Sequence, residues 1–265
     1  MTAIAVTIAG SDSGGGAGIQ ADLKTFSALG VYGASVITAL TAQNTLGVTG
    51  IHDVPPEFVS AQIDAVFSDL KVNAVKIGML SQPAVIEAVA AGLDRWKQRN
   101  VVLDPVMVAT SGDRLISPHA IDVLRHVLIP RALVITPNLP EAATLLDGAI
   151  ARSEDEMRAQ AVRLVEQGAR AVLIKGGHAE GDESVDILQA PGSFTRLATA
   201  RIATKSTHGT GCTLSSAIAA GLAKGLDLIA AVREAKAYVS AAIAAADRLT
   251  VGSGHGPVHH FHVWW

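Results

Sequence analysis

Residues 3–18 have the sequence AIAVTIAGSDSGGGAG, in which an apolar run passes directly into a glycine-rich loop. The run from Ala3 to Ala9 has the length and β-branched content of a buried strand. The loop from Gly10 to Gly18 holds five glycines in nine residues, which lets a ligand approach its backbone. This pattern is typical of a ligand-binding strand end in an α/β sheet, and an ordinary flexible turn is the alternative.

Outward from this stretch, short apolar runs alternate with longer amphipathic segments. The later predicted strands are residues 33–40, 74–77, 101–103, 133–135 and 171–174. The predicted helices are residues 19–29, 56–70, 83–97, 117–128, 140–146, 154–167, 210–223 and 228–249. Residues 184–188 and 194–198 are predicted to form a polar antiparallel pair. The alternation predicts an α/β fold with a mostly parallel sheet covered by helices on both faces, as one domain over residues 1–265.

Composition excludes several classes of protein. The 265 residues carry 21 Lys and Arg against 24 Asp and Glu, and this near-neutral balance argues against a nucleic-acid partner. A single cysteine excludes a disulfide scaffold and a cysteine-based metal site. No run of about 18 uncharged apolar residues and no basic opening segment occur, so we expect no membrane partner and a cytoplasmic location.

Polar residues follow several of the later predicted strands. In chain order they are Asp104, Asn138, Glu141 and Lys175. Because parallel strands end at the same edge of a sheet, we expect these side chains to lie close together. Carboxylates with an amide suit Mg²⁺ that bridges phosphates, and a lysine suits phosphate as a point charge. Each residue alone could be a solvated loop charge, but the set favours a phosphate site.

Two common nucleotide motifs do not fit the first glycine-rich loop. The Walker pattern requires a lysine, which residues 10–18 lack. The dinucleotide pattern requires Gly-x-Gly-x-x-Gly, whereas Gly14, Gly16 and Gly18 are spaced two apart. We reject both motifs.

A second glycine motif stands before a predicted helix, in the segment Thr207-His208-Gly209-Thr210-Gly211-Cys212-Thr213. Exposed backbone N–H groups at a helix start, together with the helix dipole, form an anion site. Such a site could hold charge developing on a transferred phosphoryl group. The only cysteine lies in the first turn, where the pKa of a thiol tends to fall. A small packing thiol is the alternative interpretation.

Taken together, these motifs resemble the ribokinase-like superfamily, and within it the hydroxymethylpyrimidine/phosphomethylpyrimidine kinases of thiamin biosynthesis. The resemblance rests on GSDSGGGAGIQAD at residues 10–22, DPV at 104–106, Asn-x-x-Glu at 138–141 and GTGC at 209–212, and it covers essentially the whole chain. It implies a ribokinase-like three-layer α/β/α sandwich. It also implies Mg²⁺- and ATP-dependent phosphorylation of 4-amino-5-hydroxymethyl-2-methylpyrimidine (HMP), then of HMP phosphate, by a homodimer.

The same resemblance implies a role for particular residues. The anion hole matches Gly209, Thr210 and Gly211, and the general base matches Cys212, with Asp12 as another candidate. The nucleotide and metal side matches Asn138, Lys175, Thr207, Asp104 and Glu141. The pyrimidine side matches Gln43, Gly10, Met79 and Val106. Segments 178–183 and 184–198 are candidates for a loop that closes over the site.

Three alternative functions stay open at this point. A pyridoxal or pyridoxine kinase of the same branch would share the fold and most of the motifs. An acyl-transfer enzyme could use Cys212 with His208. A metabolite sensor could bind ATP without transferring a phosphoryl group.

Overall fold

The computed structural model describes residues 2–107, 116–177 and 181–265. A sheet of eight strands has the order β10-β9-β8-β7-β6-β5-β1-β2. The strands are β1 (Ile4–Ala9), β2 (Tyr32–Ile37), β5 (Ala74–Ile77), β6 (Val101–Leu103), β7 (Val134–Ile135), β8 (Val172–Lys175), β9 (Glu183–Ala190) and β10 (Ser193–Ala200). The six strands β8, β7, β6, β5, β1 and β2 are parallel to one another. β9 pairs antiparallel with β8, and β10 pairs antiparallel with β9. The prediction of a mostly parallel sheet is confirmed.

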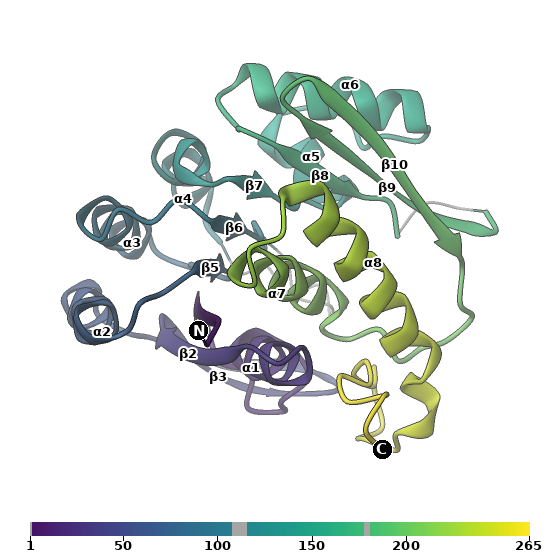
Figure 1. The fold of residues 1–265 in the computed structure, drawn as a ribbon, viewed down its shortest axis with the longest axis horizontal. Coiled ribbons are helices and arrows are strands. Elements are labelled where there is room, and N and C mark those ends of the chain that lie inside the picture. The colour runs from purple at the N-terminus through teal and green to yellow at the C-terminus, as the bar shows by residue number, and fades with distance from the viewer. Residues whose placement is uncertain (1, 108–115, 178–180) are drawn as a thin grey trace.

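Helices cover both faces of this sheet, so the fold has the three layers expected of it (Figure 1). One face carries α2 (Pro56–Asp69), α3 (Pro83–Arg95), α4 (Pro118–Val123), α5 (Leu139–Leu145) and α6 (Glu154–Glu166). The other face carries α1 (Gly18–Ala28), α7 (Thr210–Ala223) and α8 (Leu228–Ala244). Neighbouring residues of β1 pack into the apolar cores on opposite faces of the sheet. Val6 packs on the face covered by α2–α6, and Ala5 packs on the face covered by α1, α7 and α8, as in a strand buried on both faces.

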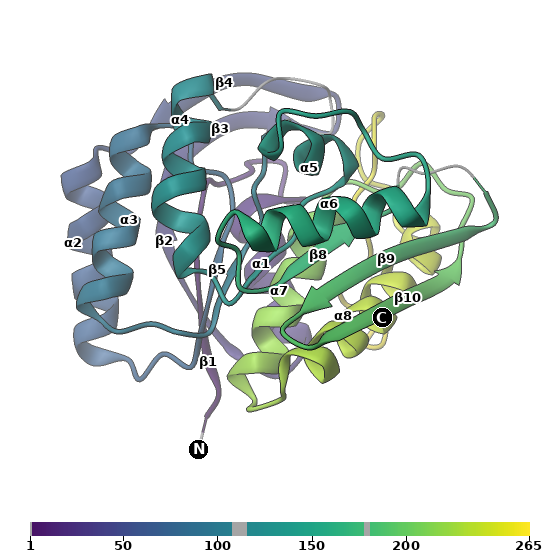
Figure 2. The same cartoon turned by 90° about the horizontal axis from the view of Figure 1, so that it is seen from above.

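One predicted strand is wrong in its second half. The sequence predicts a strand over residues 33–40, but β2 ends at Ile37 and the chain leaves the sheet. A hairpin of β3 (Ala39–Asn44) and β4 (Gly47–Asp53) follows and lies along the top of Figure 2. Most hairpin residues are half-buried or exposed, so they lack the apolar run by which a buried strand is recognised.

The other predicted elements are present, with shifted ends. The last helix ends at Ala244, and a short 3₁₀ turn, Ala246–Arg248, follows it. The polar pair, β9 and β10, joins the main sheet because β9 pairs with β8. Among the described residues, no helix has the length and apolar character that crossing a membrane would require.

Candidate active site

The carboxyl ends of the parallel strands meet the first turn of α7 at one edge of the sheet. Asp104 follows β6 and Lys175 ends β8, and the Lys175 Nζ donates to the Asp104 Oδ1 at 2.7 Å. Gly211 lies against both side chains. A Cβ on Gly211 would stand 3.2 Å from the Lys175 Nζ and 3.6 Å from the Asp104 Oδ2. The structure therefore brings the strand-end charges and the second glycine motif together.

Asn138 and Glu141 form the capping box of α5. The Asn138 Oδ1 accepts the Glu141 N–H at 2.8 Å, and the Glu141 Oε2 accepts the Asn138 N–H at 2.7 Å. This reciprocal pair fixes the start of the helix. It also holds the Glu141 Oε2 at 3.9 Å from the Lys175 Nζ, so the motif has both a structural task and a place at the site.

Burial and charge move the pKa values of the two carboxyl groups in opposite directions. Burial raises the pKa of Glu141 to about 7 in spite of Lys175, and Asp104 adds to the rise. Burial also disfavours the ionised form of Asp104, but Lys175 and Lys76 hold its pKa below its usual value. The Lys175 ammonium thus lies beside an ionised Asp104 and a Glu141 that takes up a proton readily.

The donor set fits Mg²⁺ held mainly through substrate and water. In the described part of the chain, no three His, Cys, Asp or Glu side chains gather as they would in a closed metal cage. Mg²⁺ usually binds one or two carboxylates and completes its shell with waters and phosphate oxygens. Asp104 and Glu141 supply two hard oxygen donors of this kind beside Lys175.

The start of α7 has the backbone geometry of an anion site. Gly209 precedes the helix with a φ of 79°, in the left-handed region that favours glycine. The first N–H groups of a helix have no partner within the helix. Because the Thr210 N–H donates to the Thr207 carbonyl at 3.2 Å, the N–H groups of Gly211 and Cys212 are the better placed donors for an anion. The anion hole of Gly209, Thr210 and Gly211 stays a prediction, and the next residue, Cys212, offers a further N–H group beside it.

Cys212 is half-buried, and the pKa of its thiol is shifted in the opposite direction to the one expected at the start of a helix. Burial raises the pKa of the thiol to about 11, although Lys76 and the Gly18 N–H both act to lower it. The prediction of a lowered pKa is therefore wrong. A helix start stabilises a thiolate only in competition with desolvation, and here desolvation is the larger effect.

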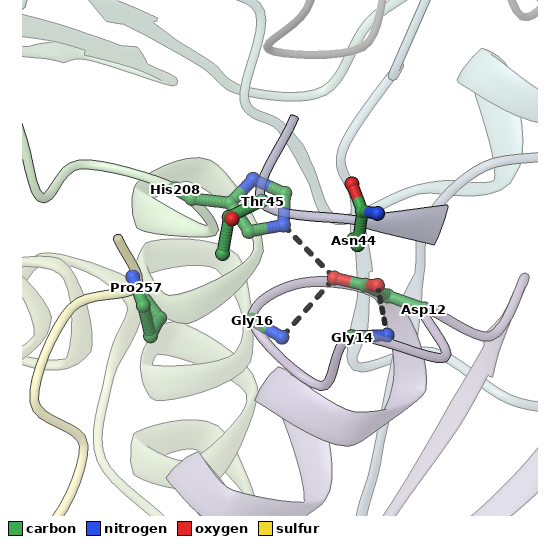
Figure 3. A pocket seen from close by; sticks show the side chains of 7 residues that line it. All are labelled: Asp12, Gly14, Gly16, Asn44, Thr45, His208 and Pro257. Carbon is green, nitrogen blue, oxygen red and sulfur yellow. Dashed lines mark hydrogen bonds and ion pairs between the residues drawn. The ribbon is translucent and has the colours of Figure 1, made fainter. Parts of the chain in front are cut away.

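Asp12 organises the first glycine-rich loop (Figure 3). Its carboxylate accepts four hydrogen bonds, from the backbone N–H groups of Gly14, Gly16 and Ala17 and from the His208 Nε2. Burial alone would raise its pKa, but the bonds from His208 and Ala17 lower it below the usual value. A carboxylate with its lone pairs used in this way is a weak base, which counts against Asp12 as the general base.

The predicted pyrimidine-side residues come from four separate parts of the chain: β3 and the segments that follow β1, β5 and β6. A Cβ on Gly10 would stand 2.6 Å from the Met79 Cε, so these two residues are in contact. Gln43 lies on β3, where the Ser13 hydroxyl donates to its carbonyl at 2.8 Å and ties the hairpin to the first glycine-rich loop. Val106 is half-buried on the turn after β6. Residues 178–180 of the candidate closing segment lie outside the described residues.

Sequence reasoning missed a buried network beneath Cys212. Lys76 lies within β5 and donates to both carboxylate oxygens of Asp22, at 2.9 and 2.8 Å. The hydroxyls of Thr7 and Ser216 also donate to Asp22, each at 2.6 Å. The sequence contained one sign of this network, because Lys76 stands in the middle of a strand predicted to be buried. A buried charge of this kind requires a partner.

Comparison with known proteins gives consistent results. The phosphomethylpyrimidine kinase family matches residues 12–259. A hydroxymethylpyrimidine/phosphomethylpyrimidine kinase of Rhizobium meliloti is 64% identical over 100% of this chain and 99% of its own length. A thiamine biosynthesis bifunctional protein of Geobacter sulfurreducens is 56% identical over 96% of this chain and 51% of its own length. Among solved structures, an ADP complex of Bacillus subtilis pyridoxal kinase has a TM-score of 0.92 at 36% identity, covering 99% of each chain.

Proposed function

The chain belongs to the phosphomethylpyrimidine kinase family, and from that premise we propose that it uses ATP to phosphorylate HMP and then HMP phosphate in thiamine biosynthesis. The observation that carries the proposal is the position of Gly211, whose backbone lies directly against the Lys175–Asp104 pair. A helix start, a lysine and a carboxylate then converge where a phosphoryl group would be transferred. Phosphoryl transfer depends mainly on such positioning and charge stabilisation.

We propose the following division of tasks on the nucleotide side. The N–H groups at the start of α7 and the Lys175 ammonium hold the transferred phosphoryl group, while Asn138 keeps Glu141 in place. Thr207 shapes the approach to the helix through its carbonyl, which accepts from Thr210. Mg²⁺, held by Asp104 and Glu141 through water, would neutralise charge on the phosphates when bound.

On the acceptor side, we propose that Gln43 recognises the aminopyrimidine ring. A side-chain amide can donate to a ring nitrogen and accept from an exocyclic amine. Gly10 brings backbone close to the ring, and Met79 and Val106 give it apolar walls. Cys212 accepts the proton of the substrate hydroxyl as its thiolate, which Lys76 and the Gly18 N–H stabilise against the effect of burial.

A comparison of the two reactions tests the role of Cys212. HMP must lose a hydroxyl proton, whereas the phosphate of HMP phosphate is largely ionised at neutral pH because its second pKa is about 6. We expect Cys212→Ala to lower kcat for HMP by about 10²–10⁴-fold, the range of general base catalysis. The loss with HMP phosphate should be much smaller. Equal losses for the two substrates in an ADP-release assay would remove Cys212 from proton transfer.

The alternative with a specific observation in its favour is pyridoxal kinase, because a kinase of that activity shares the fold so closely. An ADP-release assay with HMP and pyridoxal side by side decides between them. Preferred turnover of pyridoxal would overturn the assignment to HMP. The family and the relatives named as its kinases overturn the acyl-transfer and sensor hypotheses.

We further propose that the chain works as a single kinase domain in the cytoplasm and as a homodimer. One eight-stranded sheet runs through the chain from β1 to β10, which supports a single domain. The requirement for ATP and the free cysteine suit a reducing compartment. Leu40 and Ile51, on opposite faces of the β3–β4 hairpin, are 48% and 42% exposed, and Phe58 of α2 is 60% exposed, so this part of the chain carries apolar side chains that a second copy would cover. Light scattering after gel filtration measures the oligomeric state.

A further inference from the structure

We propose that His208 is a positioning residue, which clamps the first glycine-rich loop (residues 10–18) against the start of α7 and thereby sets the anion hole. This inference rests on the proposed function, because it assigns a device that supports phosphoryl transfer. His208 stands next to Gly209 in the chain but contributes its side chain to the opposite loop.

The contact between His208 and Asp12 is short and enclosed. The His208 Nε2 lies 2.8 Å from the Asp12 Oδ2, and the two side chains are 9% and 2% exposed (Figure 3). Hydrogen bonds that involve a charged group and little water are among the stronger ones in proteins. The two partners are 196 positions apart in the sequence, so this is a long-range link rather than a local turn.

The two loops also touch through their backbones. A Cβ on Gly16 would stand 2.3 Å from the His208 Cδ2, so the imidazole ring lies directly on Gly16. A Cβ on Gly209 would stand 1.9 Å from the Gly16 carbonyl oxygen, so the two backbones meet without space for a side chain. Any shift of loop 10–18 away from His208 would therefore leave Gly209 without the surface that supports it.

The C-terminal segment supports His208 from another direction. The His208 N–H donates to the Gly256 carbonyl at 3.0 Å, and the Val258 N–H donates to the His208 carbonyl at 3.3 Å. His260 reaches the same helix start, where its Nε2 lies 3.0 Å from the Thr213 Oγ1. The backbone of His208 is thus fixed by one segment while its side chain holds another.

This arrangement has a defined consequence for catalysis. Donors that stabilise charge in a transition state are effective because they are held in place beforehand. Without the imidazole, Asp12 keeps its three backbone N–H donors, so loop 10–18 retains its own fold. The start of α7 loses its clamp, and the donors of Gly211 and Cys212 lose precision. The expected loss falls on kcat, while ground-state binding of ATP changes little.

The test compares substitutions that keep or remove the donor. His208→Leu removes it, and His208→Gln retains an N–H at a similar distance from the backbone. We expect His208→Leu to lower kcat by about 10–100-fold with the KM for ATP nearly unchanged, and His208→Gln to recover most of the loss. His255→Leu, at an exposed histidine of the C-terminal segment, is the matched control and should behave as wild type.

A binding measurement separates positioning from general damage. Calorimetry measures the affinity of each variant for ADP alone and for ADP with aluminium fluoride and HMP, a mimic of the phosphoryl group in transfer. Under the proposal, His208→Leu weakens the mimic complex by the same factor as kcat and leaves ADP affinity within about twofold. Equal weakening of both, wild-type kcat in His208→Leu, or no recovery in His208→Gln would overturn it.

Two further arms keep the test decisive. If His208→Leu does not fold, His208→Asn replaces it, because its shorter side chain cannot reach Asp12. Asp12→Asn also disturbs the three backbone bonds of loop 10–18, so it should lower kcat further in a His208 variant, but by a smaller factor than in wild type, because both substitutions break the same contact. Full additivity in this double-mutant cycle would contradict the clamp. If wild type prefers pyridoxal to HMP, the substrate assignment fails, and the same comparison is then made with pyridoxal.

Discussion

Two lysine–aspartate pairs of this protein, one within the sheet and one at its strand ends, differ in how completely their charges are compensated. Lys76 and Asp22 are 0% exposed, and Asp22 accepts two bonds from the ammonium and one from each of two hydroxyls. Lys175 and Asp104 are 14% and 2% exposed, and Glu141 shares the same lysine at 3.9 Å. The first pair is closed and saturated. The second has more carboxyl groups than cations and lies beside the anion site.

The comparison indicates how a buried charge can serve either structure or function. A pair whose partners are all satisfied within the fold has no capacity left for a ligand, so it serves packing and electrostatics at a distance. A cluster with unbalanced charge gains when a cation or a phosphate-bound cation arrives. The two pairs are close enough for both lysines to act on Asp104, so the saturated pair still influences the unsaturated one.

The largest expected effect comes from breaking the saturated pair. Lys76→Met leaves the Asp22 carboxylate buried without its cation, and we expect the free energy of unfolding to fall by about 3–5 kcal/mol. Urea unfolding measures it. Adding Asp22→Leu to the same chain removes both charges and should restore much of the loss. A single variant as stable as wild type would show that the pair is not a structural unit.

The unsaturated pair should respond in activity instead. We expect Lys175→Met to lower kcat/KM by about 10²–10³-fold, the cost of removing one group that stabilises transition-state charge. The free energy of unfolding should change less than in Lys76→Met, because the Lys175 side chain retains some exposure. Steady-state kinetics and urea unfolding of both variants measure the contrast, with Lys224→Met at an exposed lysine as control. A reversed order of the two stabilities would contradict the comparison.

Glu141 sharpens the comparison through pH. The pKa of Glu141 is about 7 in the folded protein, against 4.5 for an unperturbed Glu as in the unfolded chain, so the folded state binds the proton more tightly. The free energy of unfolding should therefore fall as pH rises from about 4.5 to 7, by at most about 3 kcal/mol. Glu141→Gln should flatten this dependence in urea unfolding of the ligand-free protein. An unchanged slope would show that another group titrates there.

The smallest expected effect is the electrostatic influence of Lys76 on the pKa of the Cys212 thiol. Cys212 is the only cysteine, so the rate of alkylation as a function of pH reports on this thiol alone. Because Lys76 acts to lower the pKa of Cys212, Lys76→Met should raise that pKa, and one unit would slow alkylation at fixed pH by about tenfold. Lys236→Met, which breaks a buried pair with Asp186, is the matched control and should leave the rate unchanged. Equal rates in wild type and Lys76→Met would end this part of the comparison.

Apart from the β3–β4 hairpin, the sequence by itself determined the order of strands and helices, the mostly parallel sheet and the positions of both glycine motifs. These features follow from local periodicity and from residues that stand at strand ends and helix starts. The β3–β4 hairpin escaped prediction because its half-exposed residues have no apolar period. The set Asp104, Glu141 and Lys175 could be anticipated, since parallel strands bring their ends to one edge.

Only the tertiary structure decided which charges are paired and which remain available. Lys76 and Asp22 are 54 residues apart, and His208 and Asp12 are 196 apart, so no spacing in the sequence joins them. The pKa of Cys212 also depends on burial, which exceeds the effect of the helix start and raises the pKa. Desolvation and long-range pairing arise when distant segments pack together, and a linear pattern of residues does not contain that information.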